Sequence, residues 1–436
     1  MSAAPALVDL VYFNAGGGHR AAASALEQVI GLQRPGWQVR KIDLFKVLDP
    51  QDRFLKVVGF PPEAYYNRRL AKGWTIGLAQ ELRLLQWMIR LGHETLVARL
   101  REHWAVTRPD LVVSLIPNFN RALGDSLARA RPGVPLVTVL TDLADHPPSF
   151  WIEPGVEQHV VCGTDRAVDQ ALQAGVPSLR VHRVSGMILR PDFYHPGDED
   201  RAAARKAIGL DADTPVGVVM FGGHGSSVMK RIARDLPETP LILMCGHHEA
   251  LARSLRQMPS QAPRVIVGHT TEVARYLRLG DFFIGKPGPG SLSEAIHCGL
   301  PVIVTRNAST MPQERFNTAW IEQQGVGTVI PSFARIREAV GHTLSRLPEL
   351  QARVRQQRNQ AVFEIVRLID ELLPRRTASA AAAASAIKAA STSASVSAAA
   401  SRSVGPAWSA WPDRSRQRTR CLHRPSQAVP HRSLED

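Results

Sequence analysis

The sequence is poor in cysteine and has no long apolar run. Its 436 residues include four cysteines, which lie far apart and form no Cys-x-x-Cys pair. A disulfide framework or a zinc site is therefore not expected, and a reducing compartment such as the cytosol fits best. No run approaches the roughly 18 apolar residues of a transmembrane helix. The first apolar run, 7–13, follows no basic stretch, so it predicts a strand and not a signal peptide.

Acidic residues are few relative to basic ones. There are 39 Asp and Glu against 53 Lys and Arg, a formal net charge of +14. This excess suggests a polyanionic partner, which could be nucleic acid, an anionic membrane or a nucleotide. From Arg375 onward the chain is dominated first by Ala, Ser and Thr and then by Arg, Pro and Ser. Such a segment buries too little apolar surface to fold, so the tail 375–436 is predicted to be disordered.

Short apolar runs alternate with helical stretches in two successive arrays. The runs lie at 7–13, 111–115, 135–140 and 158–162, and then at 216–221, 241–246, 264–268, 282–285 and 301–305. Alternating β and α elements predict parallel sheets covered on both faces.

The predicted fold class is therefore α/β, with two Rossmann-like doubly wound domains facing a cleft. The domains are expected at 1–190 and 191–374, with 191–213 forming a linker and a helix. The helices at about 332–373 are expected to complete the second domain, with a return to the first left open. In such sheets ligands bind beyond the carboxyl ends of the strands.

Each array contains a glycine turn between a strand and a helix. Gly17 and Gly18 lie in the first turn, and Gly223, His224 and Ser226 lie in the second. Such turns let an anionic ligand approach the amides at the start of a helix. The alternative is a tight turn that only joins two elements. Neither turn has the spacing of a dinucleotide fingerprint or a P-loop, which disfavours NAD and ATP. His19 follows the first turn and is a candidate general base in the cleft.

The most informative motif is a stiff glycine turn within residues 282–317. It runs from Lys286 to Ser291 and contains Gly288 and Gly290. Ser291 is predicted to begin a helix whose free N–H groups suit phosphate.

A carboxylate follows on the first turn of that predicted helix. Glu294 could accept hydrogen bonds from two ribose hydroxyls, with stabilisation of the helix dipole as the alternative. Beyond the next strand, three polar residues supply the donors and acceptors that a polyhydroxy sugar requires: Gln313, Glu314 and Asn317.

Jointly, these motifs resemble those of GT-B glycosyltransferases related to monogalactosyldiacylglycerol synthase, the processive diacylglycerol glucosyltransferases and the peptidoglycan N-acetylglucosaminyl transferase. The matching segments are GGGHRAAASAL at 16–26, TDL and HP within 141–147, the segment 186–193, FGGHGS at 221–226, KPGPGSLSEAIHCGLP at 286–301 and PQERFN at 312–317. The resemblance spans roughly residues 7–340.

The resemblance implies that the C-terminal domain binds a UDP-sugar. Uracil would lie near His269 and Thr270, ribose at Glu294 and the pyrophosphate at Gly290 and Ser291. The sugar hydroxyls would contact Gln313 and Glu314, with Asn317 supporting them. It also implies that no cofactor and no obligatory metal is needed.

The N-terminal domain would bind the acceptor, with His19 and Asp142 as candidate bases. Asp142 follows a buried strand, where an Asx turn or a helix cap is the alternative role. The chain departs from the family at Met187, where a proline is expected. It also departs at Ile116, where the plant lipid galactosyltransferases carry a histidine before the proline. The sequence therefore defines the type of reaction better than it defines the acceptor.

Residues 53–92 mix aromatic and basic side chains. We expect this segment to contact an anionic membrane surface, because rings and cations suit the headgroup level. The alternative is an amphipathic helix that packs on the first domain. Single-stranded nucleic acid uses the same residue types, but the phosphate-and-sugar motif lies elsewhere, which makes nucleic acid unlikely as a partner. The candidate acceptor and membrane residues are Phe60, Tyr65, Arg68, Arg69 and Trp74.

The function predicted from sequence is transfer of galactose or glucose from a UDP-sugar to a membrane lipid with inversion. Diacylglycerol is the favoured acceptor, and the enzyme is expected in the cytoplasm, peripheral on the inner face of the membrane. The alternatives are an enzyme like UDP-N-acetylglucosamine 2-epimerase and a non-catalytic nucleotide-binding homologue.

Overall fold

The computed structural model describes residues 5–13, 17–49, 51, 78–195, 197, 199–308 and 310–373. Within these ranges the strands form two parallel six-stranded sheets, flanked by helices. The predicted α/β class with two doubly wound domains is confirmed. The tail 375–436 and all five candidate membrane residues, Phe60 to Trp74, lie outside the described ranges. None of the described helices is both long and apolar enough to cross a bilayer.

The first sheet has the strand order β2-β1-β3-β4-β5-β6. Its four central strands consist largely of buried Val, Leu and Ile, as expected of strands covered on both faces. The strands are β1 (Ala6–Tyr12), β2 (Trp37–Asp43), β3 (Leu111–Ser114), β4 (Leu136–Val139), β5 (His159–Cys162) and β6 (Val181–Arg183). The helices of this part are α1 (Gly18–Gln33), α2 (Leu44–Leu48), α5 (Leu78–Leu91), α6 (His93–Thr107), α7 (Asn120–Ala130) and α8 (Asp165–Gln173).

The second sheet has the order β12-β11-β10-β7-β8-β9. Its strands are β7 (Gly217–Met220), β8 (Leu241–Met244), β9 (Arg264–Val267), β10 (Phe282–Gly285), β11 (Val302–Thr305) and β12 (Gly327–Ile330). The helices that follow β6 are α9 (Arg201–Ala207), α10 (Val228–Asp235), α11 (Glu249–Arg256), α12 (Val273–Arg278), α13 (Pro289–His297), α14 (Pro312–Gln324), α15 (Ile336–Ser345), α16 (Leu347–Gln356) and α17 (Ala361–Leu372). One-turn 3₁₀ helices lie at 178–180, 191–193 and 333–335.

Three edge strands have no counterpart among the predicted strands. They are β2, β6 and β12, each at the end of its sheet. Their side chains are mostly half-buried or exposed, so their sequences lack the continuous apolar run that marks the central strands.

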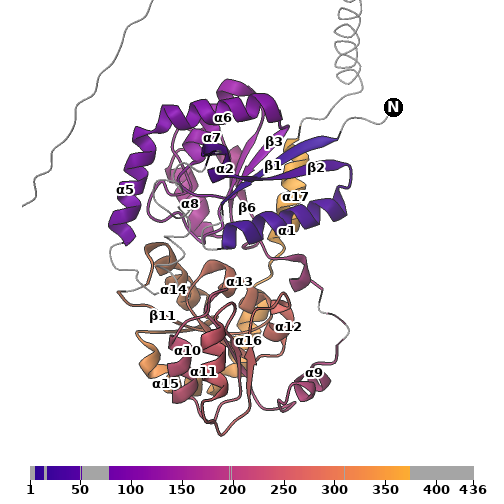
Figure 1. Ribbon diagram of the computed structural model, residues 1–436, viewed down its shortest axis with the longest axis vertical. Helices are drawn as coiled ribbons and strands as arrows, with labels where there is room; N and C mark the ends of the chain where they lie inside the picture. Colours follow the sequence, from indigo (N-terminus) through magenta and orange to yellow (C-terminus); the bar gives the residue numbers. More distant parts are fainter. Residues whose placement is uncertain are drawn as a thin grey trace, which may run out of the picture. The chain divides into compact units, whose positions relative to one another are not determined.

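The last helix returns to the first domain. Residues of α17 share a hydrophobic core with β1 and α1, and Asp370 pairs with Arg34 at 2.9 Å. Figure 1 shows α17, in orange, beside the indigo α1. The chain therefore crosses between the domains twice, and the two crossings contact each other. Asn359 Nδ2 donates to the Met187 carbonyl at 2.9 Å, and Ser185 Oγ accepts from the Gln360 amide at 2.7 Å.

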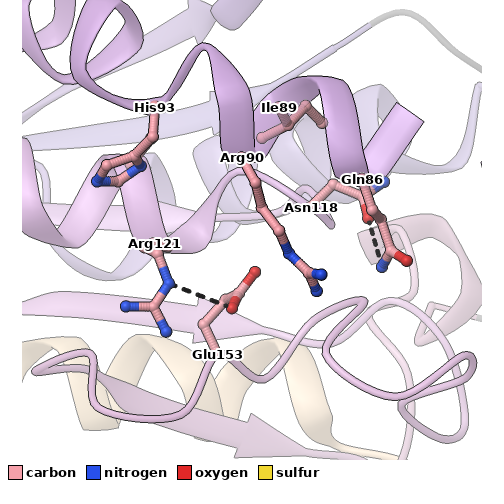
Figure 2. Close-up of a pocket in the computed structure, with 8 residues that line it drawn as sticks. Gln86, Ile89, Arg90, His93, Asn118, Arg121 and Glu153 are labelled. Atoms are coloured by element: carbon pink, nitrogen blue, oxygen red, sulfur yellow. Dashed lines mark hydrogen bonds and ion pairs between the residues drawn. The ribbon is translucent and has the colours of Figure 1, made fainter. Parts of the chain in front are cut away.

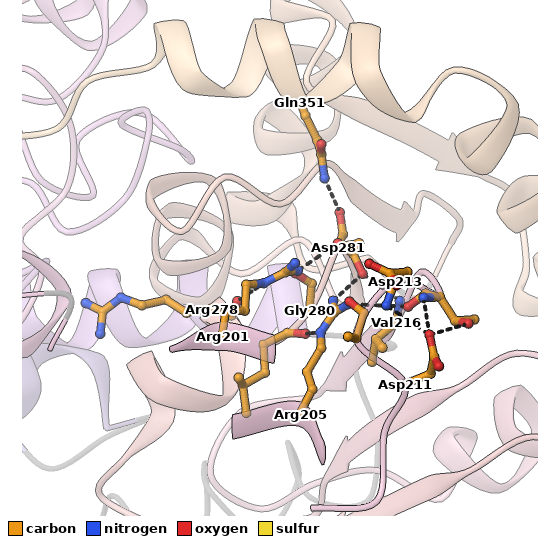
Figure 3. A network of polar contacts seen from close by, with 12 residues as sticks. Arg201, Arg205, Asp211, Asp213, Val216, Arg278, Gly280, Asp281 and Gln351 are labelled. Carbon is orange, nitrogen blue, oxygen red and sulfur yellow. Dashed lines mark hydrogen bonds and ion pairs between the residues drawn. The ribbon is translucent and has the colours of Figure 1, made fainter. Parts of the chain in front are cut away.

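A buried ionic network fixes α9 against the second sheet (Figure 3). Arg205 is 1% exposed, pairs with Asp281 and donates to the carbonyls of Leu279 and Ala212. Asp281 also accepts from the Val216 amide at 2.7 Å. The Asp281 carboxylate, just before β10, thus joins α9 to the start of β7.

Candidate active site

His19 lies on the first turn of α1, at the carboxyl edge of the first sheet. Gly17 enters the helix in the left-handed conformation, with φ of 79°. His19 Nδ1 lies 3.3 Å from Thr141 Oγ1, and its ring centroid is 5.8 Å from that of Trp151. Burial lowers the pKa of His19 to about 4. A hydrogen bond with the Leu115 backbone opposes this shift. The imidazole is therefore neutral, but it is a weak base.

Asp142 lies at the same edge, just after β4. Its Oδ2 accepts a hydrogen bond from Trp151 Nε1 at 2.9 Å. Burial raises the pKa of Asp142 to about 7, although the hydrogen bond from Trp151 opposes the shift. A carboxyl group that titrates near neutral pH is well matched to proton abstraction. Trp151 lies between the two candidate bases, since it donates to Asp142 and its ring is close to that of His19. No direct hydrogen bond joins His19 to Asp142 among the described residues.

Trp151 is a site residue that the sequence analysis missed. It is fully buried, and a carboxylate holds the loop that carries it. Asp145 Oδ1 accepts from the amides of Phe150 and Trp151 at 3.0 and 2.7 Å. Burial raises the pKa of Asp145 to about 6. The order of residues in TDLADHPPSFW carries no motif that marks the tryptophan, so only the folded loop reveals its contact with Asp142.

The predicted phosphate turn lies at the start of α13, with one correction. The helix begins at Pro289 and not at Ser291, because Pro289 supplies the preset φ that favours the first helical position. Glu294 is therefore on the second turn of α13, three residues after Ser291 and on the same face. Gly288 provides no side-chain cap, and proline has no N–H. The amides of Gly290 and Ser291 are thus directed outward, as an anion site requires.

Open space lies in front of several predicted glycines. A Cβ atom added at Gly17, Gly18, Gly223 or Gly290 would meet no other atom within 4 Å. Gly288 is different, since its added Cβ would lie 3.2 Å from Lys286 Cε and 3.4 Å from Glu314 Oε1. The first four positions leave room for a ligand, whereas Gly288 lets the lysine and the glutamate approach the turn.

The carboxyl group of Glu294 accepts no hydrogen bond from the described residues. Burial raises the pKa of Glu294 to about 7, Arg190 lowers it and Asp192 raises it. Arg190 is held nearby through its hydrogen bond to the Thr271 carbonyl at 3.2 Å. An acceptor of this kind is available for hydroxyl donors.

The first turns of α14 pack on the same glycine turn. Glu314 is 4% exposed, and its Oε1 lies 3.0 Å from Lys286 Nζ. Asn317 Nδ2 donates to the Pro287 carbonyl at 2.7 Å, while its buried Oδ1 has no partner. Gln313 is half-buried, and its Nε2 lies 3.7 Å from Met311 Sδ. The structure thus brings Glu314 and Asn317 to the turn that carries Lys286, Gly288 and Gly290.

The electrostatics connect the two sheets at this point. Glu314 raises the pKa of Asp142, and Lys286 lowers it. The charges of Lys286 and Glu314 in the second domain therefore influence the pKa of Asp142 in the first.

The remaining predicted donor residues follow β7 and β9, the strands on either side of β8, and His247 follows β8. His269 follows β9 and stacks on His247 with ring centroids 3.8 Å apart, and His224 lies 6.2 Å from His247. Thr270 Oγ1 accepts from the Glu272 amide at 3.0 Å, and Ser226 Oγ accepts from the Val228 amide at 3.3 Å.

His247 was missed because no glycine motif marks its position. It is fixed by tight backbone contacts, since an added Cβ at Gly246 would lie 2.1 Å from the Gly223 carbonyl oxygen. No group of three or more His, Cys, Asp or Glu in the described part of the chain is placed to hold a metal ion.

The sequence is similar to plant lipid galactosyltransferases. It is 26% identical over 405 residues to monogalactosyldiacylglycerol synthase 2 of Arabidopsis thaliana, a match that covers 86% of this chain and 83% of the relative. It is 27% identical to the monogalactosyldiacylglycerol synthase of Spinacia oleracea over 285 residues, or 61% of this chain and 53% of that protein. The chain thus spans about half the length of the spinach relative. No family model matches the sequence.

Solved structures share the fold at low sequence identity. The calicheamicin glycosyltransferase CalG4 has a TM-score of 0.53 at 15% identity, covering 86% of this chain and 99% of that one. MurG of Acinetobacter baumannii has a TM-score of 0.52 at 14% identity, covering 84% and 100%. A protein described as a UDP-N-acetylglucosamine 2-epimerase from Listeria monocytogenes has a TM-score of 0.50 at 13% identity, covering 84% and 96%.

The chain has the fold of the GT-B glycosyltransferases, and its sequence is similar to that of glycosyltransferases. The epimerase has the same architecture, so the fold by itself does not distinguish the two activities. Among such enzymes the chain resembles the monogalactosyldiacylglycerol synthases, and the resemblance carried by its motifs is confirmed.

Proposed function

We propose that this glycosyltransferase moves galactose or glucose from a UDP-sugar to a hydroxyl group of a membrane lipid, with diacylglycerol as the favoured acceptor. The observation that carries the proposal is the glycine turn at the start of α13, where the Lys286–Glu314 pair and Asn317 pack beside the free amides of Gly290 and Ser291. The pKa of Asp142, raised by burial to about 7, supports this carboxyl group as the base. The similarity to proteins named monogalactosyldiacylglycerol synthase supports a lipid acceptor.

The donor would bind along α13. The amides of Gly290 and Ser291 would receive the pyrophosphate, and Glu294 would accept hydrogen bonds from the ribose hydroxyls. Uracil would lie near His269 and Thr270, with Gly17, Gly18, Gly223, His224 and Ser226 beside the phosphates. Gln313 and Glu314 would contact the sugar, and Asn317 would hold α14 against the turn.

The reaction would proceed as a single in-line displacement. Asp142 or His19 would take the proton of the acceptor hydroxyl while the bond between the anomeric carbon and UDP breaks, which inverts that carbon. Of the two bases we favour Asp142, since its pKa of about 7 exceeds that of about 4 for His19. Helix amides and Lys286 would stabilise the leaving diphosphate, without an obligatory metal or cofactor. Closure of the domains would exclude water from the donor.

The decisive test is incubation of the purified protein with labelled UDP-galactose or UDP-glucose and anionic vesicles that contain diacylglycerol. We expect label to enter the lipid phase with one of the two donors. Conversion of UDP-N-acetylglucosamine to its 2-epimer without any need for vesicles would support the epimerase alternative. Tight binding of UDP without transfer to any acceptor would support the non-catalytic one.

Replacing Glu294 by alanine is expected to weaken UDP binding by about 10–100-fold, because hydrogen bonds to a charged group contribute roughly 1.5–3 kcal/mol. Isothermal titration calorimetry with UDP measures the effect. Ser293→Ala, at the neighbouring position of the same helix, is the matched control and should bind UDP normally. Unchanged affinity in Glu294→Ala would remove this residue from the donor site.

A further inference from the structure

A buried polar atom without a hydrogen-bond partner is rare in a folded protein and calls for an explanation. The cavity of about 240 Å³ beneath α5 contains none (Figure 2). There Arg121 pairs with Glu153 at 3.6 Å, and no lining residue has a buried side-chain atom that lacks a partner. Elsewhere, five of the described side chains have such an atom: His103, Tyr194, Arg264, Asn317 and Thr343. Among them Tyr194 lies where the chain crosses between the two domains.

The ring of Tyr194 contacts both domains. It packs against a hydrophobic core of the second domain and against the core that α17 shares with the first sheet. Its centroid lies 4.8 Å from that of His297, in the last turn of α13, and 4.8 Å from that of Phe363, in α17. Both contacts are edge-to-face, at interplanar angles of 66°, which is a favoured arrangement of aromatic rings. One side chain therefore joins the helix proposed to bind the donor to the helix that returns to the first domain.

The hydroxyl group of Tyr194 is buried without a partner, but a carboxylate lies near it. Burial raises the pKa of Tyr194, and the charge of Glu364 raises it further. Glu364 Oε2 accepts from the amide and from the hydroxyl group of Ser185, at 2.7 and 3.0 Å. The other oxygen, Oε1, accepts no hydrogen bond from the described residues. The crossing thus contains an unpaired donor and an unused acceptor that do not meet in this arrangement of the chain.

Binding of the donor would act on the same segment through Arg190. Burial raises the pKa of Glu294 to about 7 and Arg190 lowers it, so the two side chains lie close together. Hydrogen bonds from the ribose hydroxyls favour the ionised form of Glu294, which strengthens its attraction for Arg190. Arg190 is joined to Tyr194 by the one-turn helix 191–193. A shift of Arg190 toward α13 would therefore also move Tyr194.

We propose that Tyr194 is a positioning residue whose hydroxyl group donates to Glu364 when UDP or the UDP-sugar is bound along α13. The bond forms only in the donor-bound state, so its free energy adds to the affinity for the donor. It also draws α17, and with it the first domain, toward α13. The inference rests on the proposed function and deepens it, because it names a contact outside the donor site that binding of the donor creates.

A double-mutant cycle of Tyr194→Phe and Glu364→Gln tests this bond with and without UDP. Without UDP, Tyr194→Phe should unfold at the wild-type temperature or above it, because the change removes a buried hydroxyl group that has no partner. Calorimetry with UDP should show a loss in affinity of about tenfold, the effect of a hydrogen bond to a charged group. In Glu364→Gln, Ser185 retains an oxygen to bond while Tyr194 loses its acceptor. The double variant should therefore bind UDP no more weakly than Tyr194→Phe.

Tyr276→Phe is the control, because Tyr276 packs against the core of the second domain alone. It should change neither the unfolding temperature nor the affinity for UDP. In transfer assays, Tyr194→Phe should raise KM for the UDP-sugar about tenfold with kcat nearly unchanged, as expected of an interaction made equally in the ground state and the transition state.

Three results would overturn the proposal: additive losses in UDP affinity, equal coupling with and without UDP, or a lower unfolding temperature of Tyr194→Phe in the absence of UDP. Failure of the wild-type protein to bind UDP would overturn the proposed donor site together with this inference. Normal binding by the wild-type protein, without coupling between Tyr194 and Glu364, would overturn the inference alone.

Discussion

Replacing Asp142 by asparagine is expected to lower kcat for sugar transfer by about 10²–10⁴-fold, the usual contribution of a positioned general base. Asparagine keeps an oxygen for the hydrogen bond from Trp151 Nε1, so the loop and the fold should be preserved. Affinity for UDP should be nearly unchanged, because Asp142 is not among the residues proposed to bind the donor. Steady-state kinetics with a saturating donor, together with calorimetry, separate the two effects.

The pH dependence distinguishes the two candidate bases. A base acts when deprotonated, and burial raises the pKa of Asp142 to about 7. If Asp142 is the base, kcat rises from pH 6 to pH 8 and then levels off. Burial lowers the pKa of His19 to about 4, so a reaction that uses His19 as base would be flat over the same range. Retained activity in Asp142→Asn, together with its loss in His19→Ala, would assign the proton transfer to His19.

Replacing Arg205 by alanine is expected to reduce the free energy of unfolding by about 3–5 kcal/mol. The change leaves the carboxylate of Asp281 partly buried without its principal partner, and it frees the carbonyls of Leu279 and Ala212. Urea unfolding curves measure the difference, provided that their slopes agree with the wild-type slope.

Arg201→Ala is the control for this network. Arg201 pairs with the same aspartate at 2.7 Å, but its side chain is 46% exposed. Solvent screens such a pair, so the loss should be only ~0–1 kcal/mol. Equal losses in the two variants would show that burial does not determine the strength of these ion pairs.

Central strands and glycine turns could be predicted from sequence, whereas three of the four edge strands could not. Residues 111–115 and 282–285 form continuous apolar runs because helices cover both faces of their strands. Trp37–Asp43 pairs on one side only, and its half-exposed side chains give no such signal. The first residue of α13 could not be predicted either, because proline at the first position and serine two residues later are both compatible with a helix start.

The clustering of Lys286, Glu314 and Asn317 at one turn was predictable because they belong to one short stretch of sequence. The partner of Asp142 was not, because the contact with Trp151 depends on the path of a loop held by Asp145. Nor was the cavity beneath α5, since its lining combines Gln86, Asn118 and Glu153 from separate segments. The roles predicted for individual residues in binding and catalysis remain predictions until the variants are measured.

The return of α17 means that the first domain is not one continuous piece of chain. Val362, Ile365 and Ile369 are buried in the core that also contains Leu26 of α1. A ribosome that has made the first 190 residues has not yet supplied the helix that covers this face, and the apolar surface stays open until about residue 373 is made. Cutting the gene between the two sheets would therefore give an N-terminal fragment prone to aggregation, which supplying the last helix as a separate peptide should relieve.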